Sequence, residues 1–177
     1  CACLVGSEMC IRDSVTVVAD VGQNQIWTCT EYKFRKEGRL LTSGGMGTMG
    51  YSVPAAIGAK MADNSRATVA ICGDGAFQMS FMELATAVQF GVDIKVVVMT
   101  NNRLGMVREL QTNGYHDRQT AVFLDGSPDF IKLAEAYGIP AMRVYDDDTM
   151  EKGIEMLAEH KGICLVEVVV DKDMPTL

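Results

Sequence analysis

Short apolar runs alternate along this chain with longer amphipathic segments. Two of the runs, "ATVAIC" (67–72) and "IKVVVMT" (94–100), are almost continuously apolar, which is typical of strands buried on both faces of a sheet. Between them, apolar residues recur with helical spacing, at positions 81, 84, 85 and 88. The same reasoning predicts strands at 15–20, 39–43, 141–144 and 163–170, and helices near 23–32, 52–62, 104–112, 128–137 and 149–160.

Residues that favour helix ends support these assignments. Pro54 falls in the first turn of the helix at 52–62, where its missing N–H is harmless. Ser80 and Glu83 have the spacing of a capping box, and Gly91 suits the end of the same helix. We interpret Asp146–Asp148 as a solvated loop that caps the following helix, not as a metal site.

The regular alternation of strand and helix predicts the fold class. It implies an α/β protein with a three-layer αβα arrangement and a mostly parallel sheet of about six strands. We expect one domain over residues 15–177. Residues 1–14 lack the basic start and apolar core of a signal peptide and show no clear period, so we expect a non-native or disordered leader.

Composition narrows the possible partners. The 177 residues carry a formal charge of −7, which argues against a nucleic-acid partner, and no apolar run is long enough to span a membrane. An anionic ligand would need helix ends, backbone N–H groups or a metal ion. The six cysteines form no CxxC pair, so we expect buried, reduced thiols in a cytoplasmic protein.

A glycine-rich stretch, "TSGGMGTMGYSVPAAIGA" (42–59), raises the question of a cofactor. Gly45, Gly47 and Gly50 have the spacing of a dinucleotide-binding fingerprint, in which Asp74 would hold the ribose of NAD. The preceding strand is short for that motif, however. Asp74 also lies inside "GDG", whose glycines let the backbone itself approach a ligand.

A second pattern points to a metal ion. Gly73-Asp74-Gly75 and Asn101-Asn102 each follow a predicted strand, and one helix connects these strands. A right-handed crossover sets the carboxyl ends of neighbouring strands side by side, so Asp74 and Asn101 should face one crevice. Carboxylate, amide and backbone carbonyl oxygens, together with two phosphate oxygens and a water, suit the octahedron of Mg²⁺.

These blocks resemble a known family. The "GDG…NN" pattern looks like the thiamine-diphosphate-binding motif, and Val15–Asp173 resembles the C-terminal domain of acetolactate synthase, with its thiamine-diphosphate-binding fold. The segments that carry the resemblance are "VGQNQIW", "LTSGGMGTMGYSVPAAIGA", "GDGAFQMSFMELATAVQ" and "LGMVRE". The resemblance favours thiamine diphosphate with Mg²⁺ over NAD as the cofactor.

The resemblance also implies roles for single residues. Asp74, Asn101 and the backbone oxygen of Arg103 would bind the metal, and Val107 and Leu110 would line the substrate pocket. The backbone carbonyl of Gly47 would hold the 4′-amino group, and Met49 would lie between the two cofactor rings. The remaining cofactor-binding residues would be Gln23, Asn24, Gly73, Gly75, Ala76, Met79 and Met106.

The resemblance extends to the whole enzyme. It implies decarboxylation of pyruvate and ligation to a second 2-oxo acid, in a homodimer that a regulatory small subunit can join. The activating glutamate would lie in an N-terminal domain, so no catalytic residue is expected here and the chain is predicted to be an inactive fragment. Leu110 stands where the family commonly has Trp, and Asn24 where it often has His, which leaves the second substrate open.

Alternatives remain open at this stage. The protein could be another thiamine-dependent decarboxylase or carboligase, or a non-catalytic binding module. Met49, Met79 and Met106 could be core residues, since the chain has 12 methionines. Gln23 and Asn24 could only cap a helix, and His116 and His160 are expected at the surface.

Overall fold

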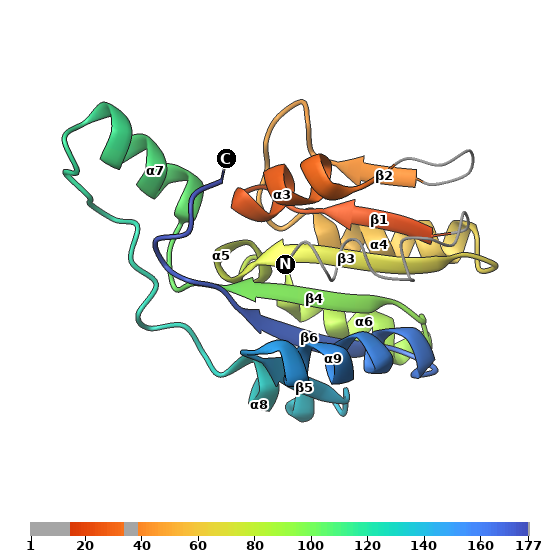
Figure 1. Cartoon of the computed structure of the whole chain (residues 1–177). Coiled ribbons are helices and arrows are strands. Elements are labelled where there is room, and N and C mark those ends of the chain that lie inside the picture. The colour runs from red at the N-terminus through yellow and green to blue at the C-terminus, as the bar shows by residue number, and fades with distance from the viewer. Residues whose placement is uncertain (1–14, 34–38, 177) are drawn as a thin grey trace.

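A single parallel sheet forms the centre of the molecule (Figure 1). The structure is a computed structural model and describes residues 15–33 and 39–176, so the expectation for residues 1–14 lies outside it. The strands lie in the order β2-β1-β3-β4-β6-β5, and every neighbouring pair is parallel. Their bounds are β1 Val15–Ala19, β2 Arg39–Thr42, β3 Ala67–Gly73, β4 Lys95–Thr100, β5 Ala141–Val144 and β6 Cys164–Val169.

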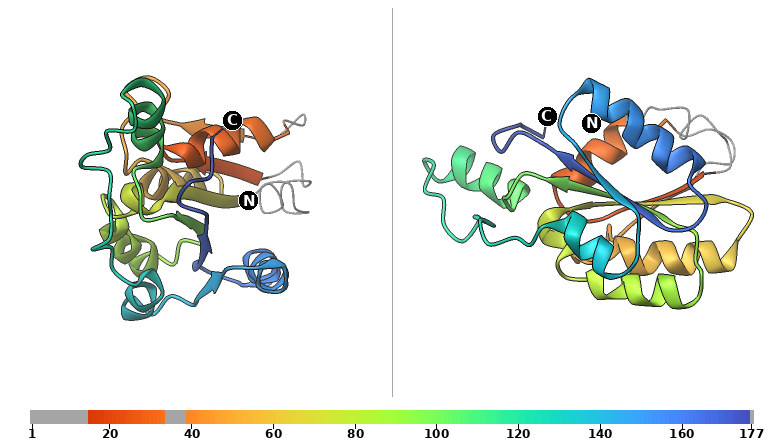
Figure 2. Two further views of the ribbon diagram at one scale, coloured as in Figure 1. Left: turned by 60° about the vertical axis from the view of Figure 1, so that its left-hand side comes forward. Right: turned by 90° about the horizontal axis from the view of Figure 1, so that it is seen from below.

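Helices cover both faces of this sheet (Figure 2). Helices α3 and α9 lie on one face, and α4, α6 and α8 lie on the other. The predicted three-layer αβα fold is therefore confirmed. The helices are α3 Gln23–Glu31, α4 Ser52–Ala62, α5 Asp74–Phe77, α6 Leu84–Gln89, α7 Gly105–Gly114, α8 Phe130–Ala136 and α9 Asp147–Glu159, with a 3-10 turn η1 at Phe81–Glu83.

The strands are apolar on both sides because each side meets its own core. Successive side chains of a strand point to opposite faces, so Val18 and Val96 pack beneath α4 and α6, whereas Val17 and Val97 pack beneath α3 and α9. All four valines are buried. At about 25 cal/mol for each Å² of buried apolar surface, this double burial is the main stabilisation of the sheet.

At two places in the sheet, the connection to the next strand runs toward one edge and the following connection runs back toward the other edge. From β1 the chain runs outward to β2 and returns to β3, and from β4 it runs outward to β5 and returns to β6. Ligands of open parallel sheets bind at the carboxyl ends of strands at such points. The loops after β1, β3 and β4 meet at the first of them, and they carry most of the predicted site residues.

The capping box predicted at Ser80 and Glu83 is wrong. The segment begins with a 3-10 turn, in which the Glu83 N–H donates to the Ser80 carbonyl oxygen (3.0 Å) and not to the hydroxyl. The Ser80 hydroxyl is buried without a hydrogen-bond partner, and the Glu83 carboxylate accepts from the Thr86 hydroxyl (2.9 Å). Gly91 does follow the helix end, with a φ of 59°.

Other local expectations can be checked directly. Asp146 caps α9 as predicted, in a reciprocal capping box with Thr149, but Asp147 and Asp148, which we expected in the loop, form the first turn of the helix. Cys72 and Cys164 are buried free thiols, and burial raises the pKa of Cys164 to about 11, but Cys29 is exposed, contrary to expectation. Among the described residues, no helix has the length and apolar character needed to cross a bilayer.

Two helical glycines should respond oppositely to alanine. At Gly153 of α9, a Cβ atom would lie 2.9 Å from Val144 Cγ2 and 3.4 Å from Val166 Cγ1, so Gly153→Ala must push the helix from the sheet. We expect a loss of about 1–3 kcal/mol in the free energy of unfolding, as for an overpacked core.

The matched control is Gly58→Ala on α4, where a Cβ would meet nothing within 4 Å. This substitution should stabilise the protein by about 0.5–1 kcal/mol, because alanine loses less backbone entropy than glycine. Urea unfolding followed by circular dichroism measures both. Equal midpoints for the two variants would contradict the packing described for α9.

Candidate cofactor site

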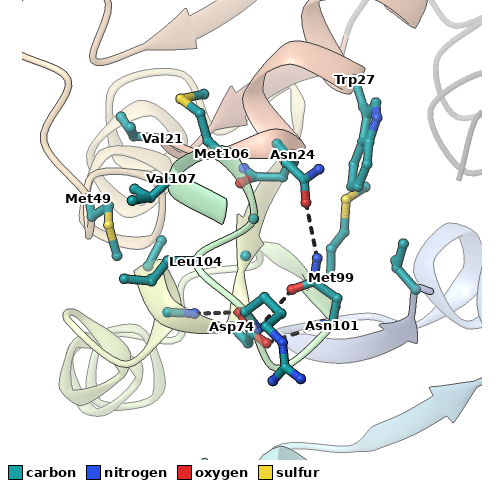
Figure 3. A pocket seen from close by; sticks show the side chains of 18 residues that line it. Val21, Asn24, Trp27, Met49, Asp74, Met99, Asn101, Leu104, Met106 and Val107 are labelled. Carbon is teal, nitrogen blue, oxygen red and sulfur yellow. Dashed lines mark hydrogen bonds between the residues drawn. The ribbon is translucent and has the colours of Figure 1, made fainter. Parts of the chain in front are cut away.

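A buried carboxylate joins the ends of the two central strands. Asp74 follows β3 directly, and its side chain is only 2% exposed. One carboxylate oxygen accepts the Gly75 N–H (2.8 Å), and the other accepts the N–H groups of Asn101 (3.2 Å) and Asn102 (2.6 Å) after β4 (Figure 3). The structure thus brings Asp74 and Asn101 side by side, as the crossover argument predicts.

The electrostatics of this carboxylate favour a bound cation. Burial raises the pKa of Asp74, and the N–H donors of Gly75, Asn102 and Asn101 oppose that rise. No lysine or arginine among the described residues lies within ion-pair distance of it; the nearby Arg103 pairs with Asp125 instead (3.0 Å). A buried carboxylate without a cationic partner is costly, and a divalent ion would compensate it.

Asn101 connects this carboxylate to helix α3. Its amide nitrogen donates to Gln23 Oε1 (3.1 Å), and its amide oxygen accepts the Arg103 N–H (3.1 Å). The Gln23 amide nitrogen in turn donates to the Met174 carbonyl oxygen (3.0 Å) and the Thr176 hydroxyl (3.2 Å). Loops after β1 and β4 and the segment after β6 therefore meet at one point.

A pocket opens beside these residues at the carboxyl edge of the sheet (Figure 3). Met49 and Trp27 lie on opposite sides of it in this view, with Asp74 and Asn101 between them. Apolar side chains dominate the rest of its wall. Its lining residues are Val21, Gly22, Gln23, Asn24, Trp27, Met49, Gly73, Asp74, Gly75, Ala76, Met99, Asn101, Arg103, Leu104, Gly105, Met106, Val107 and Val170.

Glycines allow the backbone to approach this pocket closely. A Cβ at Gly75 would lie 2.7 Å from Leu104 Cδ2 and 3.4 Å from Met49 Cε, so a side chain there would fill the space between the walls. A Cβ at Gly105 would lie 1.8 Å from Gln23 Oε1. At these two positions the pocket is therefore walled by backbone, and the space that a side chain would take stays open or is used by Gln23.

Comparison with known proteins indicates which anionic cofactor belongs to this pocket. Residues 20–168 match the model of the thiamine pyrophosphate enzyme family, specifically its C-terminal TPP binding domain. The chain belongs to this family. The cofactor of the family is thiamine diphosphate, also called thiamine pyrophosphate, so the glycine spacing at 45–50 does not mark an NAD site.

Relatives of this thiamine pyrophosphate domain include three proteins from distant organisms. The acetolactate synthase catalytic subunit of Aspergillus candidus is 41% identical over 166 residues, covering 94% of this chain and 24% of that protein. The acetolactate synthase large subunit of Lactococcus lactis is 42% identical over 156 residues (88% and 27%). A probable large subunit from Methanocaldococcus jannaschii is 39% identical over 155 residues (88% and 26%). The chain thus spans about a quarter of the length of these relatives.

Most of the predicted site residues line this pocket, but three do not. Gly47 lies in the exposed loop before α4, Met79 is 55% exposed beside Gly50, and Leu110 is 62% exposed on the outer part of α7. Val107, one turn earlier on α7, does line the pocket. The roles expected of all these residues stay predictions.

The alternative that Gln23 and Asn24 only cap a helix is not supported. Gly22 is the N-cap residue of α3, and no side chain caps that end. Asn24 is buried, and its amide nitrogen donates to the carbonyl oxygens of Asp20 (2.9 Å) and Ile71 (3.2 Å). Both side chains therefore serve the pocket wall of this thiamine pyrophosphate domain.

Sequence reasoning missed several wall residues. Trp27 lies one helical turn after Asn24, and that i, i+3 spacing on α3 could have revealed it. Leu104 could have been found from its place between Arg103 and Met106. Met99 and Val170 come from the ends of β4 and β6, and no local signal separates them from ordinary core residues.

Gly105→Ala should displace the Gln23 side chain, because the new methyl group would occupy the position of its amide. Gln23 would lose its hydrogen bonds to Asn101 and Met174, and we expect the free energy of unfolding to fall by about 1–2 kcal/mol. The direct measurement is the NMR signal of the side-chain amides of Gln23 and Asn101.

Gly114→Ala at the other end of α7 is the control, since a Cβ there lies 4.0 Å from Leu110 Cδ1, an ordinary contact. Its spectrum should match that of the unsubstituted chain at both amides. Unchanged Gln23 and Asn101 signals in the Gly105 variant would contradict the close approach described above.

Proposed function

We propose that Asp74, Asn101 and the backbone oxygen of Arg103 hold Mg²⁺, which in turn holds the diphosphate of thiamine diphosphate. The carrying observation is the buried Asp74 carboxylate, which has no cationic partner among the described residues and bonds to the backbone of Asn101. Arg103 also forms an isolated antiparallel β-bridge with Phe123. The hydrogen bonds of this bridge use the Asn102 carbonyl and the Leu104 N–H, so the bridge does not occupy the Arg103 carbonyl oxygen.

The donor set suits magnesium more than a softer metal. Within the described part of the chain, no three histidine, cysteine or acidic side chains cluster as a metal site. One carboxylate, one amide oxygen and one carbonyl leave positions for phosphate oxygens and water, which is how Mg²⁺ is commonly bound. The ion would also offset the repulsion between the diphosphate and a chain of charge −7.

The rest of the pocket would orient the organic part of the cofactor. Gln23, Asn24, Gly73, Gly75 and Ala76 would face the diphosphate. The Gly47 carbonyl, with Met49, Met79 and Met106, would contact the ring system. When bound, thiamine diphosphate supplies a thiazolium ring, whose deprotonated carbon adds to 2-oxo acids and whose positive charge takes up the electrons released with CO₂. The apolar walls around Met49 and Leu104 would exclude water from that reaction.

We further propose that the chain is one domain of a longer acetolactate synthase. Its similarity to proteins of that name, over about a quarter of their length, supports this. The complete enzyme would join pyruvate to a second 2-oxo acid, in branched-chain amino-acid synthesis. An N-terminal domain in a homodimer would supply the activating glutamate, and a regulatory small subunit could bind.

Two finer assignments belong to the same proposal. Val107 and the exposed Leu110 on α7 would line the substrate pocket at its outer rim. The free thiols of Cys72 and Cys164 suit a reducing compartment, and we propose a cytoplasmic location on that basis.

Asp74→Asn should abolish magnesium-dependent cofactor binding. We expect affinity to fall by about 100-fold or more, because even outer-shell partners of a bound metal are typically worth 10- to 100-fold. Trp27 is the only tryptophan of the chain and lines the pocket, so its fluorescence reports binding of thiamine diphosphate with Mg²⁺. The control, Asp148→Asn, makes the same change at an exposed position in the first turn of α9. Equal titrations for the two variants would reject the metal site.

The complete gene product distinguishes acetolactate synthase from the nearest alternative. Incubated with pyruvate, thiamine diphosphate and Mg²⁺, it should produce acetolactate, detected as acetoin after acid decarboxylation. Release of free acetaldehyde without acetolactate would identify a simple decarboxylase. No turnover despite bound cofactor would favour a binding module.

A further inference from the structure

One acidic side chain outside the pocket joins two of its walls. Asp20 follows β1, and it is fully buried, with 0% of its surface exposed. One carboxylate oxygen accepts the N–H groups of Val21 (2.8 Å) and Gly50 (3.0 Å), and the other accepts the Ser52 N–H (2.7 Å). No lysine or arginine of the described residues forms an ion pair with it.

The segment held by Asp20 is the end of the glycine-rich loop. Residues 44–48 are exposed, and their hydrogen bonds are local, such as Gly47 N–H to the Ser43 carbonyl oxygen (3.0 Å) and Thr48 N–H to the Ser43 hydroxyl (3.1 Å). The bonds to Asp20 fasten this loop to β1, immediately beside Met49. Gly50 has a φ of 84°, so the chain turns sharply at the point of attachment.

Asp20 also holds the opposite wall of the pocket, which α3 contributes through Asn24. The Asp20 carbonyl oxygen accepts from the amide nitrogen of Asn24 (2.9 Å), and the Asp20 N–H donates to the Ile71 carbonyl oxygen of β3 (2.8 Å). Asn24 and Met49 both line the pocket, from α3 and from the glycine-rich loop respectively. Asp20 therefore sets the position of one wall relative to the other without lining the pocket itself.

Only a carboxylate can accept all three of these N–H hydrogen bonds. Three N–H donors converge on its two oxygens, and a buried N–H that loses its acceptor costs free energy. In Asp20→Asn, one oxygen becomes an NH₂ group, which can accept nothing. In either orientation of the amide, at least one of the three N–H groups would face another donor.

We propose that Asp20 is a positioning residue for the cofactor, acting through the backbone of Gly50 and Ser52 to hold Met49 at a fixed distance from the Asp74–Gly75 wall. This inference rests on the proposed cofactor function of the pocket. Met49 Cε lies 3.4 Å from where a Cβ would stand on Gly75, so a small shift of the loop would change the width of the pocket.

The first test needs no variant. Hydrogen exchange measured by NMR on the unsubstituted chain should show the amides of Gly50 and Ser52 protected, and those of residues 44–46 exchanging rapidly. Fast exchange of the Gly50 amide would overturn the proposal, because the Asp20 bond would then not hold the loop.

The second test compares affinities for thiamine diphosphate with Mg²⁺, followed by Trp27 fluorescence at a temperature where every variant is folded. Asp20→Asn should weaken binding about tenfold, the effect of roughly one lost buried hydrogen bond. Gly153→Ala is the control for general destabilisation, because it acts at α9, far from the loop, and should leave affinity unchanged.

The outcomes separate this inference from the proposed function. Equal affinity of Asp20→Asn and the unsubstituted chain would overturn the role of Asp20 and leave the cofactor site intact. Equal losses in Asp20→Asn and Gly153→Ala would also overturn it, since stability alone would then explain the effect. Failure of the unsubstituted chain to bind would overturn the proposed function itself.

Discussion

The geometry of the pocket depends most on the hydrogen bonds between the Asp74 carboxylate and the backbone of Asn101 and Asn102. They tie the end of β3 to the end of β4, where the sheet's own ladder stops. Both carboxylate oxygens accept hydrogen bonds from backbone N–H groups, which fix the orientation of the carboxylate. None of these donors carries a full positive charge, so the negative charge of Asp74 is not neutralised. The hydrogen bonds that order the two loops thus also hold the carboxylate at the proposed cation site.

Around that point, side chains from the end of β1 and the start of α3 hold the neighbouring segments in place. Gln23 reaches Asn101, Asn24 reaches the backbone of β3, and Asp20 reaches Gly50 and Ser52. The apolar sheet beneath supplies stability but no chemistry. The polar contacts at its carboxyl edge contribute less to stability, yet they decide the shape of the pocket. The packing of α9 on the sheet at Gly153 is therefore separate from the contacts that shape the pocket.

Much of the fold could be predicted because each buried strand is a nearly continuous apolar run between polar turns. The juxtaposition of Asp74 and Asn101 was also predictable, since it follows from the crossover alone. Helix α5 could not be predicted, because four residues are too few to show a period. The Ser80 capping box failed because a 3-10 turn gave the Glu83 N–H to a carbonyl oxygen. Contacts such as Gln23 with Met174 join residues far apart in sequence, and no local pattern encodes them.

Both outermost strands, β2 and β5, are only four residues long. An edge strand offers unpaired N–H and C=O groups to any other chain, and short edges leave little length for such pairing. Large apolar side chains are instead exposed on helices, such as Phe90 beyond α6 and Leu110 on α7. The two edges of the sheet therefore offer little backbone along which the sheet could extend from one molecule into the next.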